Sequence, residues 1–328
     1  MRSNESSCQG MTAYSRRPGV KEIKTVAVIG AGVMGAGLAQ LFAQNGYAVR
    51  LHDVSEVATM RAAKRASENL KMQADFGWIE PGEIAVALDR IKSTVELEDA
   101  VGQADFVIEA VPEVLELKKE VFARLGELAP ADTVLASNTS TFDVMSEMPD
   151  SIADRVLITH FFNPPQLVPL VEVVMGERTS RDSSDTAMVL LGAIGKYPLL
   201  IKRYSPGFVV NRVQLAINAM AYMILNEGVL EPEDIDKAVE NSISLRLAVG
   251  GPFATMDLGG LDVMAASART MGLEPPPPLA DLVERGDLGV KTGKGFYDYG
   301  DSSEEEILRR RDYRLMLLLD AYRKGLEA

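Results

Sequence analysis

Over the first two thirds of the chain, short apolar runs alternate with longer amphipathic stretches, a pattern typical of strands that alternate with helices. The apolar runs predict buried strands at 25–29, 47–52, 104–111, 133–136, 155–160 and 170–174. The amphipathic stretches predict helices at 34–44, 61–76 and 117–128. This order predicts an α/β fold with a doubly wound parallel sheet, which binds its ligands at the carboxyl ends of the strands.

The stretch 25–49 carries no charged residue and is longer than the ~20 residues that cross a bilayer. A membrane helix is therefore one interpretation. The same stretch contains five glycines, and Asn45-Gly46 is a typical helix end. A buried strand, a glycine turn and a helix explain these residues better, so we expect no membrane association.

From residue 205 onward the pattern becomes helical. Ser205 and Pro206 predict a helix start, with Ser205 as the cap, and this apolar helix continues to about Asn226. Further helices are expected after Glu231, around 250–262 and at 307–322, with a proline loop at 274–278. We predict a disordered leader at 1–20, an α/β domain at 21–204 and an all-α domain at 205–328; a natural start at Met11 is an alternative.

Composition narrows the class of protein. The length of 328 residues fits two domains, and the net charge of −13 argues against a nucleic-acid partner, which would need clustered Lys and Arg. Cys8 is the only cysteine, so neither an intrachain disulfide nor a cysteine-based zinc site can form. This fits a reducing compartment, and we expect a cytoplasmic protein without a metal.

The turn after the first strand has the spacing G-x-G-x-x-G. Gly30 permits the tight turn, Gly32 lets the backbone approach a pyrophosphate, and Gly35 lets the helix, which includes Met34, pack on the strand. Asp53 ends the second strand, where a carboxylate binds ribose hydroxyls and repels a 2′-phosphate. The sequence thus predicts NAD rather than NADP; the alternative is a structural glycine turn with an incidental aspartate.

The chain contains two histidines, and His52 lies next to Asp53 at the adenosine side. His160 is therefore the candidate if hydride transfer needs an imidazole. Glu172 is the one charge inside the apolar strand 170–174, where a carboxylate needs a partner. Two neighbouring strands could join the pair, with the carboxylate fixing the imidazole tautomer. The spacing equally allows an outward Glu172 and a structural His160.

Ser140 and Asn211 are two further candidate site residues. Ser140 and His160 both follow strand ends, at the edge where a nucleotide would lie. Asn211 lies within an apolar helix, where a half-buried amide needs partners. A substrate oxygen and a backbone group are both possible partners for Asn211.

Six ordered motifs resemble the L-3-hydroxyacyl-CoA dehydrogenase family, from Lys21 to Tyr299. They are GAGVMGAGLAQ, ASNTS, HFFNPP followed by LVEVV, SPGFVVNR, GPFATMDLGGLD and GVKTGKGFYDY. The resemblance implies a Rossmann-type NAD-binding domain followed by an all-α C-terminal domain for substrate binding and dimerisation. It also implies an NAD-dependent enzyme that forms a homodimer.

The resemblance assigns roles to single residues. His160 is the acid-base residue, Glu172 holds it, and Ser140 and Asn211 bind the substrate oxygen. The implied cofactor contacts, besides the glycine turn, are Met34, Asp53, Glu113, Lys118, Asn138 and Lys291.

The implied reaction is oxidation of a short 3-hydroxyacyl-CoA to the 3-ketoacyl-CoA. The stretch PPQLVP after Asn163 differs from that of the fatty-acid enzymes, and carnitine and gulonate dehydrogenases also vary there. A free 3-hydroxy acid is therefore an alternative substrate. A third hypothesis is that the protein binds NAD without catalysing a reaction. β-Hydroxyacid dehydrogenases share a similar glycine turn but use a lysine base. The His–Glu pair therefore argues against membership of that family.

Overall fold

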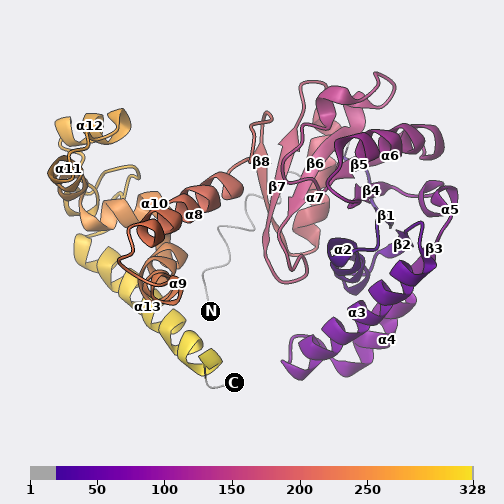
Figure 1. Ribbon diagram of the computed structural model, residues 1–328, viewed down its shortest axis with the longest axis horizontal. Coiled ribbons are helices and arrows are strands. Elements are labelled where there is room, and N and C mark those ends of the chain that lie inside the picture. The colour runs from indigo at the N-terminus through magenta and orange to yellow at the C-terminus, as the bar shows by residue number, and fades with distance from the viewer. Residues whose placement is uncertain (1–19, 327–328) are drawn as a thin grey trace. The chain divides into compact units, whose positions relative to one another are not determined.

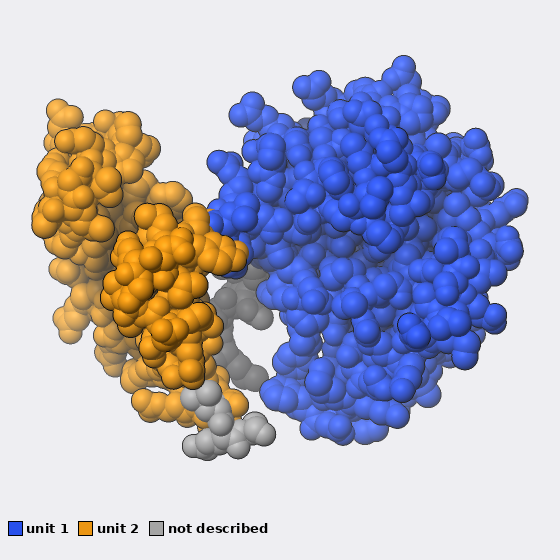
Figure 2. Space-filling model, in the orientation of Figure 1, with its two compact units in different colours: residues 1–215 blue, residues 216–328 orange. Residues whose placement is uncertain are grey.

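The computed structural model describes residues 20–326. Internal contacts divide the chain into two units, one up to Leu215 and one from Ala216, which Figure 2 colours separately. The boundary falls inside helix α8 (Val210–Asn226). The predicted leader lies outside the described residues except for its last residue.

The first unit is built on one eight-stranded sheet with the order β3-β2-β1-β4-β5-β6-β7-β8 (Figure 1). Strands β1 to β6 are parallel, which confirms the doubly wound sheet. The strands are β1 (Thr25–Ile29), β2 (Ala48–His52), β3 (Ile91–Thr94), β4 (Phe106–Glu109), β5 (Val134–Ser137), β6 (Val156–Phe161), β7 (Leu170–Met175) and β8 (Tyr197–Ile201).

The parallel pattern ends at β7, which runs antiparallel to β6, while β8 is parallel to β7. An entirely parallel sheet is therefore wrong for the last two strands. Only residues 162–169 connect β6 to β7. A parallel crossover needs a dozen or more residues, so the short connection requires the chain to reverse.

Helices cover both faces of the sheet (Figure 1). On one face α2 and α7 bury Leu38, Phe42 and Leu190 against the strands, and on the other α6 buries Phe122 and Leu125. The helices of this unit are α2 (Val33–Gln44), α3 (Glu56–Asp75), α4 (Pro81–Asp89), α5 (Leu97–Val101), α6 (Leu115–Leu128) and α7 (Arg181–Ala193).

The charge-free stretch 25–49 forms β1, the glycine turn, α2 and the start of β2. It is neutral because it lies in the core of the unit, where Val26, Val28 and Phe42 are fully buried. Within residues 20–326 no helix has the length and apolar character needed to cross a membrane.

The second unit is helical. It contains the rest of α8, then α9 (Pro232–Ala238), a π-helical segment (Val239–Ser244), α10 (Leu245–Gly259), α11 (Leu261–Thr270), α12 (Pro277–Glu284) and α13 (Glu304–Leu326). Its small core is formed by Leu261, Ala265, Leu279 and Leu282. Helix α12 begins inside the stretch that the sequence analysis assigns to a proline loop, because Pro277 is compatible with the first helical position.

The predicted helix start at Ser205 is wrong. Gly207 and Phe208 have φ values of 73° and 49°, so the backbone makes a left-handed turn there. Helix α8 begins only at Val210. Ser205 and Pro206 resemble a helix start locally, but the following glycine permits a turn that a helix cannot contain.

Candidate active site

The glycine turn between β1 and α2 has a different role for each glycine. Gly30 has φ 105°, and a Cβ there would lie 2.6 Å from the carbonyl oxygen of Ala110. A Cβ on Gly35 would lie 1.7 Å from the oxygen of Gly30. A Cβ on Gly32, by contrast, meets nothing within 4 Å. Gly30 and Gly35 are therefore required by the fold, while the space beside Gly32 is open.

This open space fits the diphosphate of NAD. Gly32 is the N-cap of α2 and gives the helix no side-chain cap, so the positive end of the helix dipole faces it. Asp53 follows β2, and its Oδ2 accepts a hydrogen bond from Ala31 N at 2.8 Å. Its Oδ1 accepts one from Ser55 N at 3.0 Å. The carboxylate is thus fixed beside the turn, as ribose recognition requires. Met34 is half-buried against the core.

His160 and Glu172 lie directly opposite each other on β6 and β7. The antiparallel register puts both side chains on one face, and His160 Nδ1 lies 2.8 Å from Glu172 Oε2. Glu172 is 0% exposed and His160 is 6% exposed. An outward-pointing Glu172 is therefore excluded. His160 belongs to β6 itself, not to the loop after it, and its ring contacts those of Phe162 and Phe208.

The second oxygen of Glu172 holds the start of α8. Oε1 accepts hydrogen bonds from the N–H groups of Val209 at 2.9 Å and Val210 at 3.0 Å. Burial alone would raise the pKa of Glu172, but the hydrogen bonds from His160 and these two amides outweigh it and lower the pKa below its ordinary value. Glu172 is therefore ionised at neutral pH, which favours a proton on Nδ1 of His160 and leaves Nε2 to act as a base.

The loop after β5 carries Ser140 into the same neighbourhood. Asn138 Oδ1 accepts a hydrogen bond from Phe161 N at 2.9 Å, which ties the loop to the end of β6. Asn211 Nδ2 donates to the carbonyl oxygen of Ser140 at 3.2 Å. Of the two partners that the sequence leaves open for Asn211, this structure shows the backbone group. Ser140 and Asn211 are thus joined by a hydrogen bond, and His160 is connected through Glu172 to the N–H of Val210, the residue before Asn211.

Glu113 and Lys118, for which the resemblance implies cofactor contacts, form an ion pair with each other in this structure. Lys118 is 1% exposed and forms ion pairs with Glu109 and Glu113. Glu109, which is fully buried at the end of β4, was not among the candidate residues. It has a signal like the one that singled out Glu172, a carboxylate inside an apolar strand, although the predicted strand 104–111 also contains Asp105.

Lys291 lies in the second unit, in the short 3₁₀ helix Val290–Thr292. Its Nζ is 2.5 Å from Oδ1 of Asp262, and this contact lowers the pKa of Asp262. Nearby, buried Asp257 accepts hydrogen bonds from the backbone N–H groups of Phe296 and Tyr297. The segment 291–297 is thus fastened to α10 and α11 by the side chains of Asp257 and Asp262.

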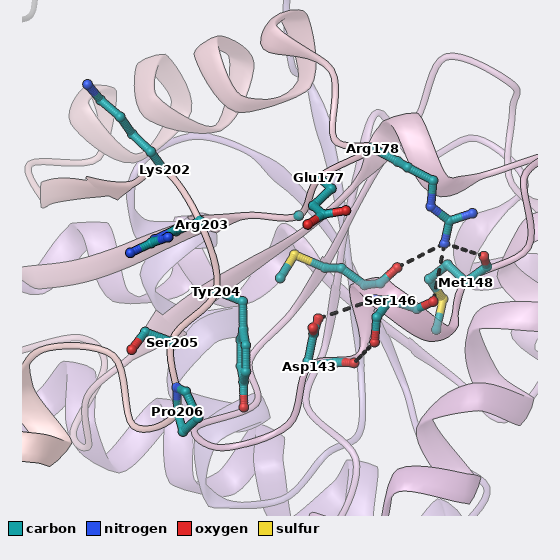
Figure 3. Close-up of a pocket in the computed structure, with 12 residues that line it drawn as sticks. Asp143, Ser146, Met148, Glu177, Arg178, Lys202, Arg203, Tyr204, Ser205 and Pro206 are labelled. Carbon is teal, nitrogen blue, oxygen red and sulfur yellow. Dashed lines mark hydrogen bonds between the residues drawn. The ribbon is translucent and has the colours of Figure 1, made fainter.

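A cavity of about 750 Å³ adjoins the loop 138–144, called the serine loop below because it carries Ser140 (Figure 3). The hydroxyl of Tyr204 donates to the carbonyl oxygen of Thr141 at 2.6 Å. Arg178 donates to backbone carbonyls of the loop 145–148. In Figure 3 the side chains of Lys202 and Arg203 extend away from this loop. Arg178 is thus fastened to the loop 145–148 by backbone hydrogen bonds.

The fold and site define a nucleotide-dependent dehydrogenase with a sheet domain followed by a helical domain. The chain belongs to the 3-hydroxyacyl-CoA dehydrogenase family. The model of the family's NAD binding domain matches residues 25–204, and that of its C-terminal domain matches residues 207–299. The protein is accordingly an NAD-dependent oxidoreductase, which confirms the predicted enzyme class and cofactor.

Similar proteins differ in substrate. A 3-hydroxybutyryl-CoA dehydrogenase of Clostridioides difficile is 37% identical over 284 residues, which cover 84% of this chain and 99% of that protein. The 5-formyl-3-hydroxy-2-methylpyridine 4-carboxylate 5-dehydrogenase of Mesorhizobium japonicum is 31% identical over 301 residues, 90% and 96% of the two chains. The crystal structure of a 3-hydroxyacyl-CoA dehydrogenase from Archaeoglobus fulgidus superposes with a TM-score of 0.73 at 32% identity, covering 90% of this chain and 99% of that one.

Proposed function

We propose that the protein oxidises the 3-hydroxyl group of a short 3-hydroxyacyl-CoA to a 3-keto group. The observation that carries this proposal is the buried contact of 2.8 Å between His160 and Glu172, on the same sheet that carries an open nucleotide turn after β1. NAD, when bound, accepts the hydride from C3. The family supplies the class of reaction, and the identity of similar 3-hydroxybutyryl-CoA dehydrogenases supports the thioester.

The side chains of the site divide the proton chemistry between them. His160 takes the hydroxyl proton at Nε2, a role usually worth about 10²–10⁴-fold in rate. Glu172 stabilises the imidazolium that forms, because its carboxylate is already ionised. Ser140 and Asn211 orient the substrate oxygen, and the hydrogen bond between them keeps their positions linked.

A small free hydroxy acid is the second candidate substrate. It is supported by the Mesorhizobium japonicum relative, which is similar over 90% of this chain and is named for a pyridine carboxylate. The stretch after Asn163, where this sequence departs from fatty-acid enzymes, lies in the connection from β6 to β7, next to His160. A change of substrate there would leave the proton chemistry unaltered.

We also propose that residues 205–328 bind the substrate and form a homodimer. Helix α8 has no buried residue within the single chain, and Leu215, Met220 and Tyr222 on it are more than half exposed. Exposed apolar area of this kind is typical of subunit interfaces. Sedimentation equilibrium would show about twice the monomer mass; a monomer at micromolar concentration would contradict the proposal. A cytoplasmic location stays a prediction.

The substrate is tested by following NADH absorbance with 3-hydroxybutyryl-CoA, longer acyl-CoA substrates, free 3-hydroxybutyrate, carnitine, gulonate and a pyridine carboxylate. We expect the highest kcat/KM for the short thioester. A higher value for a free acid would replace the first candidate by the second. Binding of NADH without turnover of any substrate would refute both and leave an NAD-binding protein.

A further inference from the structure

A buried lysine next to the serine loop bridges two carboxylates. Lys118 Nζ lies 2.8 Å from Oε1 of Glu109 and 3.1 Å from Oε2 of Glu113. The side chains of Lys118 and Glu109 are 1% and 0% exposed. A buried ammonium group is costly unless it is paired and hydrogen-bonded, so the three side chains must keep close to this geometry.

Glu109 connects this lysine to the ends of two strands. It is the last residue of β4, and its register partner on β5 is Ser137. Ser137 Oγ donates to Glu109 Oε2 at 2.6 Å, and the backbone N–H of Val111 donates to Oε1 at 2.8 Å. The carboxylate therefore fixes the point where the chain leaves β5 for the serine loop.

Glu113 connects the same lysine to the loop itself. Its Oε1 accepts hydrogen bonds from the backbone N–H of Ser140 at 3.0 Å and from the hydroxyls of Thr139 and Thr141. Burial would raise the pKa of Glu113, but the Thr139 hydroxyl and the Lys118 charge outweigh it and lower the pKa below its ordinary value. Glu113 is thus charged at neutral pH, and its hydrogen bonds are the strong, charge-assisted kind.

We propose that Lys118, Glu109 and Glu113 are positioning residues that hold the backbone at Ser140, so that its hydroxyl meets the substrate oxygen. The inference rests on the role of Ser140 in the proposed function. It is a separate role from the cofactor contact that the family resemblance implies for Glu113 and Lys118. A lysine that is 1% exposed and bonded to two carboxylates has its donors directed at the protein.

The test compares Lys118→Met with Lys119→Met. Lys119 is the next residue on α6 and forms ion pairs near the surface with Glu116 and Glu147, so the same substitution there is a matched control. Lys118→Met should speed hydrogen exchange in peptides that cover residues 138–142 by about tenfold or more, because the loop loses its anchor. Lys119→Met should leave this exchange unchanged.

Kinetics separate a positioning effect from loss of the fold. For Lys118→Met we expect kcat/KM to fall by about 10²-fold, since small misplacements of a catalytic group have effects of this size. The isotope effect on kcat with deuterium at C3 should rise, whereas a merely unfolded fraction would lower kcat without changing KM or the isotope effect.

A second variant covers the case in which Lys118→Met does not fold. The double substitution Glu109→Gln with Lys118→Met removes a carboxylate together with the lysine, so fewer unpaired buried charges remain. It should show the same faster exchange at 138–142.

Unchanged exchange in the folded variants would overturn the inference. A wild-type protein without turnover would refute the proposed function instead, and the exchange comparison would still decide whether these residues hold the loop.

Discussion

Replacing Glu172 by glutamine tests the chemistry of the site with almost no change in shape. The substituted side chain can still accept hydrogen bonds from Val209 and Val210 through its oxygen. Its NH₂ group then faces Nδ1 of His160 at the place where Oε2 now lies, 2.8 Å away. An amide donor there requires Nδ1 to be the acceptor, so the imidazole proton moves to Nε2, where the base should be free.

Two magnitudes follow from these contacts. A base with the wrong tautomer loses most of its contribution, so kcat should fall by about 10²–10⁴-fold. The two amide hydrogen bonds change from a charged to a neutral acceptor, a difference of about 1 kcal/mol each in a buried setting. We therefore expect Glu172→Gln to lower the free energy of unfolding by about 2 kcal/mol.

The assay is NADH absorbance under saturating substrate, combined with urea unfolding of the same preparations. Glu177→Gln is the matched control, because Glu177 is exposed just beyond β7. It should leave both quantities unchanged. A Glu172→Gln enzyme with kcat within about fivefold of the wild type would refute the tautomer argument, since that loss is below the usual value of a general base.

The pH dependence of stability gives a second readout of the same residue. The pKa of Glu172 is lowered in the folded protein from its ordinary value of 4.5. A carboxyl with a lowered folded pKa stabilises the protein above its unfolded pKa, and this contribution is lost as the pH falls through the folded value. Stability should therefore decline below about pH 4.5, and less steeply in Glu172→Gln.

Four further substitutions test other parts of the site. His160→Ala should lower kcat by at least about 10²-fold while Kd for NADH, measured by fluorescence, stays nearly unchanged; turnover like that of the wild type would exclude the base role. Gly32→Ala should weaken NADH binding without loss of thermal stability, because the added Cβ meets only open space. Gly35→Ala should instead lower the free energy of unfolding by about 3 kcal/mol or more, because the added Cβ would lie 1.7 Å from a backbone oxygen. Asp53→Asn should reduce the preference for NAD over NADP in kcat/KM by about tenfold, and an unchanged ratio would show that the carboxylate does not select the cofactor.

The sequence predicted those features that depend on local pattern. The glycine turn could be recognised because a strand, three spaced glycines and a helix follow one another within residues 25–44. Glu172 stood out because it is the one charge in an apolar strand. NAD binding followed from the turn and from Asp53, and the family resemblance agreed with it.

The features that sequence reasoning missed depend on distant residues. The edge strand β3 is half polar, so it lacks the apolar run of a buried strand. The start of α8 was misplaced because the N–H groups of Val209 and Val210 bond to Glu172, which lies 37 and 38 residues earlier in the chain. The partners of Lys118 come from a strand end and a loop, and no spacing along its own helix indicates them.

The facing positions of His160 and Glu172 on two antiparallel strands affect how such an enzyme can diversify. The connection 162–169 lies outside the paired positions, so residues can be exchanged or inserted there while the strands keep their alignment. Deletion of one residue from either strand would shift the pairing by one position, so that the imidazole and the carboxylate would point to opposite faces of the sheet. The connection can therefore change in sequence and length while His160 and Glu172 keep facing each other.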